Sequence, residues 1–302
     1  MFISTSTFSR RLAYLVKTRS AVLSLGDALE RRRRAELPDL PVVITIDDGF
    51  YSTLEVVKSQ LAPQAMPATL YVTSYYADKQ TPIFRLVVAY IFWKTEAGEL
   101  HLASLVHDWS GVVNLEDRTA AQEAMRRIVD YGERELNDPG RCELALRLGH
   151  LLGVDYQIIV ASRLFSLLKK DELRELEALG VDIELHTHRH RLPLDEAEVA
   201  REIGDNRMWL GGVVRSQLEH FCYPSGDWSP EHPPWLAALG VKSAVTCDVG
   251  LNGPDTPHLA LRRWLDDESV SQIEFEAEVS GYAELLRQVR ARAKRLTGKR
   301  AS

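Results

Sequence analysis

The feature that most constrains the fold is the run from Val42 to Gly49, in which five apolar or β-branched residues lead into two aspartates and a glycine. A continuous β-branched run after Pro41 predicts a strand that is covered on both faces, as in parallel sheets. If Asp47 and Asp48 were both buried and ionised, they would repel each other unless a cation, a shared proton or water offset their charge. The run therefore indicates either a charged site at a strand end or a solvated Asp-Gly turn, which is common turn chemistry.

Composition limits the class of protein. The chain has 302 residues, of which 45% are hydrophobic and 26% are charged, and this suits one large α/β domain or two small ones. The formal net charge is -6. Proteins that bind nucleic acids usually carry an excess of basic residues, so no nucleic-acid partner is expected. The three cysteines are widely spaced and form no CxxC pair, which indicates a reducing compartment rather than a disulfide framework.

No targeting or membrane-spanning segment is predicted. The first twenty residues carry four basic side chains and no uninterrupted apolar core, unlike a signal peptide. No segment reaches the roughly twenty apolar residues of a membrane helix. The longest apolar stretch, Ile83 to Trp93, is interrupted by Arg85 and indicates a buried core helix, with peripheral membrane contact as the alternative. A cytoplasmic protein is the expectation.

The order of elements predicts a parallel sheet with a helical insertion. A strand over 42–46, a helix over 52–61 and a strand over 68–73 form a strand, helix, strand unit. From about 81 to 170 the pattern indicates several helices and no clear strand. A helix over 170–179 and a strand over 181–185 then continue the alternation of strands and helices. We interpret residues 1–302 as a single catalytic domain with the insertion at about 81–170.

Two predicted helices carry clusters of basic residues. The first is the run Arg31 to Arg34, where cations favour the helix dipole, so a solvated helix end is the default and an anionic partner the alternative. The second is an amphipathic helix over 282–299, whose charge indicates a solvated face, with a binding surface as the alternative.

Two further polar motifs follow predicted strands. His186, His188 and His190 come directly after the strand over 181–185. A short strand then leads into a Pro/Gly turn over 220–226. Because the carboxyl ends of parallel strands gather on one face, these residues are expected near Asp47 and Asp48. Neutral imidazole is a common ligand of transition metals, so the histidines indicate a metal site, with an exposed polar loop as the alternative.

The ordered set of Thr45–Gly49, His186–His190 and Phe221–Gly226 resembles the polysaccharide deacetylase (NodB-homology) family of metal-dependent carbohydrate N-deacetylases, in a branch with a long helical insertion. The resemblance covers nearly the whole chain and is weaker in the insertion. It implies an α/β fold, a distorted (β/α) barrel with fewer than eight repeats. It also implies a hydrolase that acts on carbon-nitrogen bonds other than peptide bonds.

The resemblance assigns roles to the acids and histidines. Asp47 takes the position of the general base, and Asp48, His186 and His190 take the positions of the metal ligands, which leaves His188 outside the ligand set. Two imidazoles and one carboxylate leave open positions, as catalytic zinc requires. Zinc is the first choice by ligand type, with cobalt, nickel or iron as alternatives.

The resemblance also assigns residues around the substrate. The backbone N–H at Tyr223 takes the position that binds the oxyanion, and Pro224 fixes the turn. Thr187 shapes the neighbouring loop, and Thr187 and Pro224 are expected to line the substrate site.

The chain departs from the common family pattern at two places. Many members have an arginine where this chain has Cys222, and Leu261-Arg262-Arg263-Trp264 instead resembles the Leu-Pro-Arg ending of another branch. We therefore expect Arg263 to orient Asp47 through a bidentate charge pair. The general acid is unassigned: His188 and His258 are the candidates, and ordinary surface histidines are the alternative for both.

The implied activity is removal of an N-acetyl or other acyl group from an amino sugar in a polysaccharide, oligosaccharide or glycolipid precursor. Two alternatives stay open: a hydrolase of the same fold that cleaves a formamide or cyclic amide, and a non-catalytic relative that binds carbohydrate. The sequence leaves the glycan and the oligomeric state open.

Overall fold

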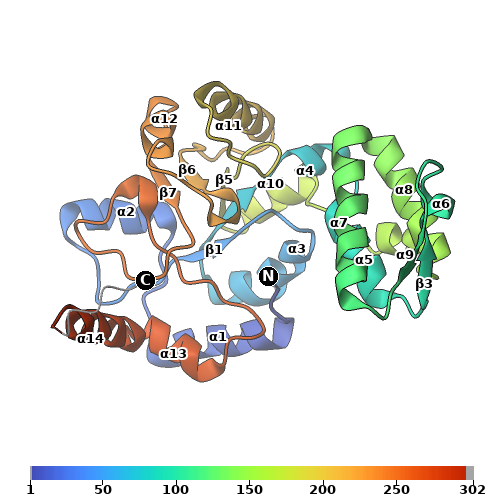
Figure 1. Cartoon of the computed structure of the whole chain (residues 1–302). Coiled ribbons are helices and arrows are strands. Elements are labelled where there is room, and N and C mark those ends of the chain that lie inside the picture. Colours follow the sequence, from blue (N-terminus) through green and yellow to red (C-terminus); the bar gives the residue numbers. More distant parts are fainter. Residues whose placement is uncertain (1, 297–302) are drawn as a thin grey trace. The chain divides into compact units, whose positions relative to one another are not determined.

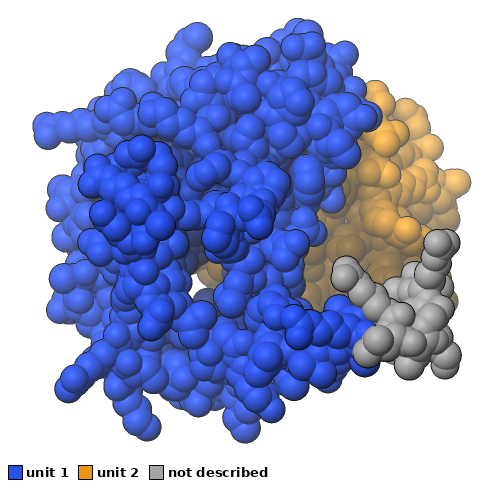
Figure 2. Space-filling model, turned by 90° about the vertical axis from the view of Figure 1, so that its left-hand side faces the viewer, with its two compact units in different colours: residues 1–75, 170–302 blue, residues 76–169 orange. Residues whose placement is uncertain are grey.

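The chain divides into two compact units. The computed structural model describes residues 2–296. The first unit is formed by residues 1–75 and 170–302, and the second by residues 76–169 (Figure 2). The second unit thus begins a few residues before the insertion expected at about 81–170. Within the described residues, no helix combines the length and apolar character needed to cross a bilayer.

A parallel sheet organises the first unit (Figure 1). Among the described residues it has five strands in the order β1-β2-β5-β6-β7, and every neighbouring pair is parallel. The strands are β1 (Ile44–Ile46), β2 (Ala68–Val72), β5 (Val181–Leu185), β6 (His220–Cys222) and β7 (Ser243–Val245). The predicted distorted (β/α) barrel with fewer than eight repeats is confirmed.

Helices connect and flank these strands. The predicted helix over 52–61 is split, because α3 (Ser52–Val56) passes into a π-helical turn, η1 (Val57–Leu61). A 3₁₀ turn over Ala62–Gln64 then ends the helix at Pro63. The other helices of this unit are α1 (Thr5–Thr18), α2 (Leu25–Arg34), α10 (Lys170–Ala178), α11 (Glu196–Gly211), α12 (His232–Ala238), α13 (Gln272–Val279) and α14 (Tyr282–Leu296). The last three residues of the predicted helix over 282–299 lie outside the described residues.

The two edge strands of the sheet are brought together by the segment that follows β7. Leu261 in this segment forms a parallel bridge to Val245 of β7. Two residues later, the Arg263 guanidinium donates to the Thr246 carbonyl at 3.0 Å and to Thr45 Oγ1 of β1 at 3.2 Å. The sheet is therefore curled, and Arg263 spans its two edges.

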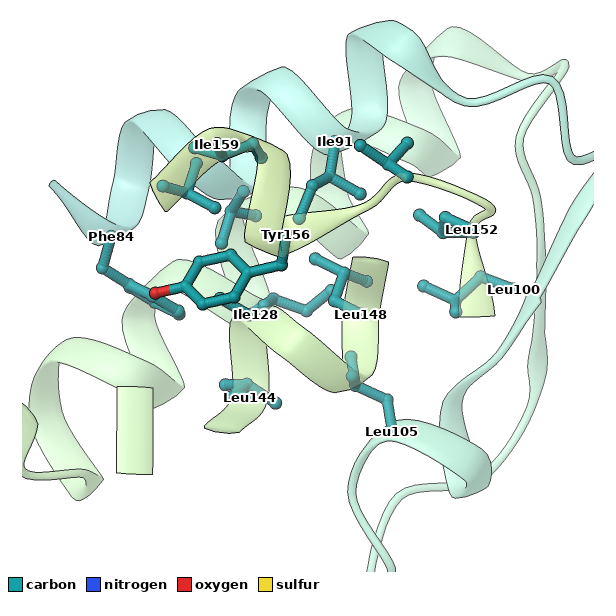
Figure 3. Close-up of a cluster of buried hydrophobic side chains, with 14 of the residues drawn as sticks. Phe84, Ile91, Leu100, Leu105, Ile128, Leu144, Leu148, Leu152, Tyr156 and Ile159 are labelled. Atoms are coloured by element: carbon teal, nitrogen blue, oxygen red, sulfur yellow. The ribbon is translucent and has the colours of Figure 1, made fainter. Parts of the chain in front are cut away.

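The second unit has its own apolar core, drawn in Figure 3. The apolar stretch at 83–93 forms α5, whose Phe84, Val88 and Ile91 are buried in this core, as predicted, whereas Trp93 is exposed. Its helices are α4 (Tyr75–Lys79, which begins at the boundary), α5 (Phe84–Lys94), α6 (Leu102–Leu105), α7 (Arg118–Glu135), α8 (Asp138–Leu151) and α9 (Tyr156–Ala161).

The second unit also contains a short antiparallel pair of strands, β3 (Glu99–His101) and β4 (Val112–Asn114). The prediction of a purely helical segment is therefore corrected. Each strand has three residues, and this is too short to produce a recognisable alternation in the sequence.

Gly132 of α7 lies directly against the Phe84 ring of α5. A Cβ added there would lie 2.3 Å from the Phe84 ring, so alanine is expected to destabilise the second unit by about 1–3 kcal/mol through overpacking. Gly204 in α11 is the matched control, because a Cβ there meets nothing within 4 Å. Gly204→Ala is expected to stabilise the chain by about 0.5–1 kcal/mol. Urea unfolding of both variants measures the contrast, and equal effects would contradict this packing.

Candidate active site

The acid pair and the histidine motif meet where the sheet strands end. Asp48 Oδ1 lies 3.4 Å from His186 Nε2 and 3.1 Å from His190 Nε2. The two imidazole rings pack edge to face with centroids 4.9 Å apart. Of the two sequence interpretations of the acid pair, the structure therefore favours a charged site over a solvated turn.

The turns that aim these side chains have left-handed backbone. Asp48, Thr187 and His190 have φ values of 70°, 62° and 54°, which few residues other than glycine adopt. Gly49 follows with φ of 87°, and a Cβ there would lie 3.2 Å from a Val72 methyl group. Glycine is thus required both by its backbone angle and by its contact. Such strained residues persist where surrounding contacts hold them, and here two of them, Asp48 and His190, carry ligand atoms.

The three residues fit a divalent metal ion. One ligand atom from each of Asp48, His186 and His190 lies within 4.8 Å of the others. Two ligands at about 2.1 Å from a tetrahedral ion lie about 3.4 Å apart, close to the measured Asp48–His186 and Asp48–His190 separations. Cys222 C=O accepts the His186 Nδ1–H at 2.8 Å, which leaves Nε2 as the ligand atom. These residues therefore form a plausible ligand set with positions left open for other groups.

Electrostatics favour a cation at this point. Burial by itself would raise the pKa of Asp48, but hydrogen bonds from His186 and His190 hold it well below the usual range. The pKa of His186 is raised despite its burial, because the Asp48 carboxylate accepts a hydrogen bond from its ring and the Asp47 carboxylate lies nearby. A site that so strongly favours positive charge on an imidazole also favours a metal ion.

Asp47 is held by an arginine from the far end of the chain. Arg263 Nη1 donates to Asp47 Oδ1 at 2.8 Å and Nη2 donates to Oδ2 at 2.9 Å, the bidentate pair anticipated from the sequence. Burial would raise the pKa of Asp47, but the guanidinium lowers it overall. Asp47 is therefore an ionised carboxylate of fixed orientation beside the metal-ligand set.

Cys222 also contacts Asp47. Its Sγ lies 3.4 Å from Asp47 Oδ2 and 3.2 Å from Arg263 Nη2. Burial raises the pKa of the Cys222 thiol, so it is neutral and packs in the core. Cys247 is partly buried and lies 3.8 Å from the same guanidinium nitrogen.

Two residues that support the histidine loop were missed by the sequence analysis. Asn206 of α11 accepts the His186 N–H at 3.0 Å and donates to the Val72 carbonyl at 3.0 Å and to Ser74 Oγ at 2.9 Å. One turn earlier, the buried Glu202 carboxylate accepts the Arg189 N–H at 2.7 Å. Polar residues four apart on the covered face of a helix are the signal that could have indicated this support.

The residues expected around the substrate make contacts within the fold. The Tyr223 N–H donates to the Val245 carbonyl at 3.1 Å and the Tyr223 hydroxyl to the Leu259 carbonyl at 2.9 Å, so this N–H is already used within the sheet. Thr187 is fully buried and its Oγ1 accepts the Arg191 N–H, which fits the predicted shaping of the loop. Pro224 is also buried. Thr187 and Pro224 therefore expose little surface, and their contact with a substrate stays a prediction.

The turn after β6 contains another backbone N–H, that of Ser225, which is not used within the described part of the fold. The Gly226 and Asp227 N–H groups donate to the carbonyls of Tyr223 and Pro224 within the turn. Ser225 is exposed, has φ of 58°, and its N–H has no acceptor among the described residues. This N–H is therefore available to a bound molecule.

The two histidines considered as general acids lie in different surroundings. His188 Nδ1 is 2.8 Å from Ser74 Oγ, and its ring packs edge to face on Tyr75, so His188 joins the histidine loop to the end of β2. His258 lies in the 3₁₀ turn His258–Ala260 and is exposed. The contacts of His188 named above are with Ser74 and Tyr75, and His258 is exposed, so the proton donor stays unassigned.

Comparison with known proteins agrees with these observations. The family described as polysaccharide deacetylase matches residues 149–244, a segment that contains the histidine motif and the turn after β6 but not the acid pair. No curated protein matches the chain in sequence.

Solved structures share the fold. The Streptococcus pyogenes deacetylase PplD, in complex with acetate, superposes with a TM-score of 0.60 at 14% identity, over 92% of this chain and 87% of that chain. IcaB from Ammonifex degensii superposes with a TM-score of 0.55 at 17% identity, over 93% and 90%. The family match covers 96 of the 302 residues, so the chain is similar to the polysaccharide deacetylase family over that segment and shares the fold of solved deacetylases.

Proposed function

We propose that the protein is a metal-dependent hydrolase that removes an N-acetyl group from an amino sugar in a polysaccharide, oligosaccharide or glycolipid precursor. The observation that carries this proposal is the position of Asp47, which Arg263 fixes beside the Asp48, His186 and His190 ligand set. The family match and the deacetylases of the same fold support a deacetylase activity.

Asp48, His186 and His190 would hold the metal, and zinc suits this ligand set best. When bound, a divalent ion there supplies Lewis acidity that polarises a carbonyl and acidifies water. The Cys222 carbonyl and Asn206 orient His186 from behind, as supporting groups do around catalytic metals.

In this proposal Asp47 acts as the general base. Arg263 keeps the carboxylate ionised and directs both of its oxygens, so that Asp47 can accept a proton from a water molecule attacking the amide carbonyl. The Ser225 N–H, in the turn after β6, has no acceptor among the described residues and would be a candidate donor to the carbonyl oxygen of the substrate.

Release of acetate tests the activity directly. The purified protein, loaded with zinc, is incubated with chitin oligomers and with N-formyl and cyclic-amide compounds in parallel. Acetate release from the N-acetylated sugars is expected. Turnover of the formamide or cyclic amide alone would favour the second class of hydrolase, and oligomer binding without any turnover would favour a carbohydrate-binding protein.

Arg263 is expected to act as a positioning residue for Asp47. Arg263→Ala should lower kcat by about 100-fold with little change in KM, because misplacing a reacting group by about 1 Å can cost that much. Arg263→Lys keeps the charge but loses the two parallel hydrogen bonds, so its kcat should fall between those of Ala and wild type. Steady-state kinetics on the metal-loaded variants measures kcat and KM separately. Equal kcat in all three proteins would remove Arg263 from the mechanism.

A further inference from the structure

Helix α14, labelled in Figure 1, is attached to the first unit by its polar face. Arg287 donates to both carboxylate oxygens of Glu278 in α13, at 2.7 and 2.8 Å, and to Glu284 of its own helix at 2.8 Å. Arg287 and Glu284 are only partly exposed, so ion pairs occupy the face of α14 that lies against the protein.

The opposite face of α14 is apolar and exposed. Tyr282, Leu285, Leu286 and Val289 are 56%, 55%, 37% and 53% exposed. Their spacing of three and four residues places them in one stripe along the helix, which we call the α14 stripe. A surface helix of a soluble protein normally turns its apolar stripe toward the core, so this helix has the reverse orientation. Such an arrangement marks an interaction surface.

The charge around the α14 stripe indicates what it contacts. Residues 282–296 contain five basic side chains and one acidic one, in a chain whose net charge is -6. At about 100° per residue, the exposed Arg290 and Arg292 fall on the two sides of the stripe. An apolar stripe flanked by arginines is the pattern of helices that lie in the interface of a membrane with anionic lipids.

We propose that α14 docks in the plane of an anionic membrane surface, with the α14 stripe in the boundary between headgroups and acyl chains and Arg290 and Arg292 on lipid phosphates. A second copy of the chain fits this surface less well. Two α14 helices packed stripe against stripe would bring their flanking arginines together, and like charges at an interface oppose association. This inference rests on α14 and is independent of the proposed activity.

Vesicle co-sedimentation of the full-length protein tests the proposal. Wild type is expected to sediment with phosphatidylcholine vesicles that contain phosphatidylglycerol, more weakly with phosphatidylcholine alone, and less as salt is raised. The double variant Leu285→Ser, Val289→Ser should lose at least about tenfold in affinity, since each side chain loses its burial in the bilayer. Arg290→Glu, Arg292→Glu should lose the preference for phosphatidylglycerol.

Met208→Ser in α11 is the matched control, because Met208 is an apolar side chain that is 78% exposed and lies on a helix other than α14. It should bind vesicles like wild type. Equal sedimentation of wild type and the Leu285/Val289 variant would overturn the proposal, provided that their circular dichroism spectra agree. A wild-type dimer that becomes a monomer in that variant, measured by light scattering without vesicle binding, would also overturn it and assign the stripe to a second copy.

Discussion

Asp47→Asn is expected to lower kcat for acetate release by about 10²- to 10⁴-fold, the usual contribution of a positioned general base. Asparagine has nearly the same shape but cannot accept the proton, and its amide nitrogen would face one of the Arg263 donors. Bound zinc should be unchanged, because the three ligand side chains are intact. The measurement is a comparison of kcat and of metal content by elemental analysis on the same preparations.

Asp48→Asn gives the contrast that separates the two neighbouring carboxylates. Asp48 Oδ1 lies within 3.4 Å of the Nε2 atoms of both His186 and His190, so this variant should lose metal together with activity. Asp47→Asn should lose turnover alone. If Asp47→Asn kept a wild-type kcat, or if both variants lost metal equally, the unequal roles given to the two acids would be wrong.

His190→Ala is expected to weaken zinc binding by more than about 100-fold, since even residues that only support a metal ligand contribute about 10- to 100-fold. His190 suits this test because its side chain is 18% exposed, against 2% for His186, so truncation disturbs the core less. Turnover should fall with metal occupancy and recover in part with excess zinc. Zinc titration by calorimetry and kinetics at several zinc concentrations measure both effects.

His188→Ala is the matched control, because it removes an imidazole from the same loop, between the two proposed ligands. His188 contacts Ser74 and Tyr75, so the variant is expected to keep zinc affinity and to lose some thermal stability. Zinc affinities that fell equally in both variants would show that the loop as a whole, rather than His190 as a ligand, governs the metal site.

The parts of the site that follow from topology could be predicted from the sequence. The strand over 181–185 has the same bounds in the structure, and β1 and β2 lie within the predicted ranges. Because parallel strands end on the same face, residues at those ends must converge, and Asp48, His186 and His190 do so. The pairing of Arg263 with Asp47 was anticipated from the family resemblance rather than from topology, because Leu261–Trp264 resembles the Leu-Pro-Arg ending of another branch and the common family arginine is replaced by Cys222.

The parts that depend on register and packing could not be predicted. The N–H of Tyr223 is used by Val245 because of how β6 aligns with β7, which no local pattern encodes. Asn206 supports His186 because α11 packs behind the histidine loop, and polar helix residues are usually solvated. The π-helical turn at 57–61 likewise has no simple signal in its residues.

The contact between Arg263 and Asp47 joins residues 216 positions apart, and this separation sets an order for assembly during synthesis. All three proposed metal ligands have been synthesised once residue 190 is made, but the residue that orients the base comes 73 positions later, at 263 minus 190. Contacts between such distant residues form late, because the intervening chain must first be ordered. In the proposed function, turnover therefore requires the segment beyond β7, because only that segment brings Arg263 to Asp47.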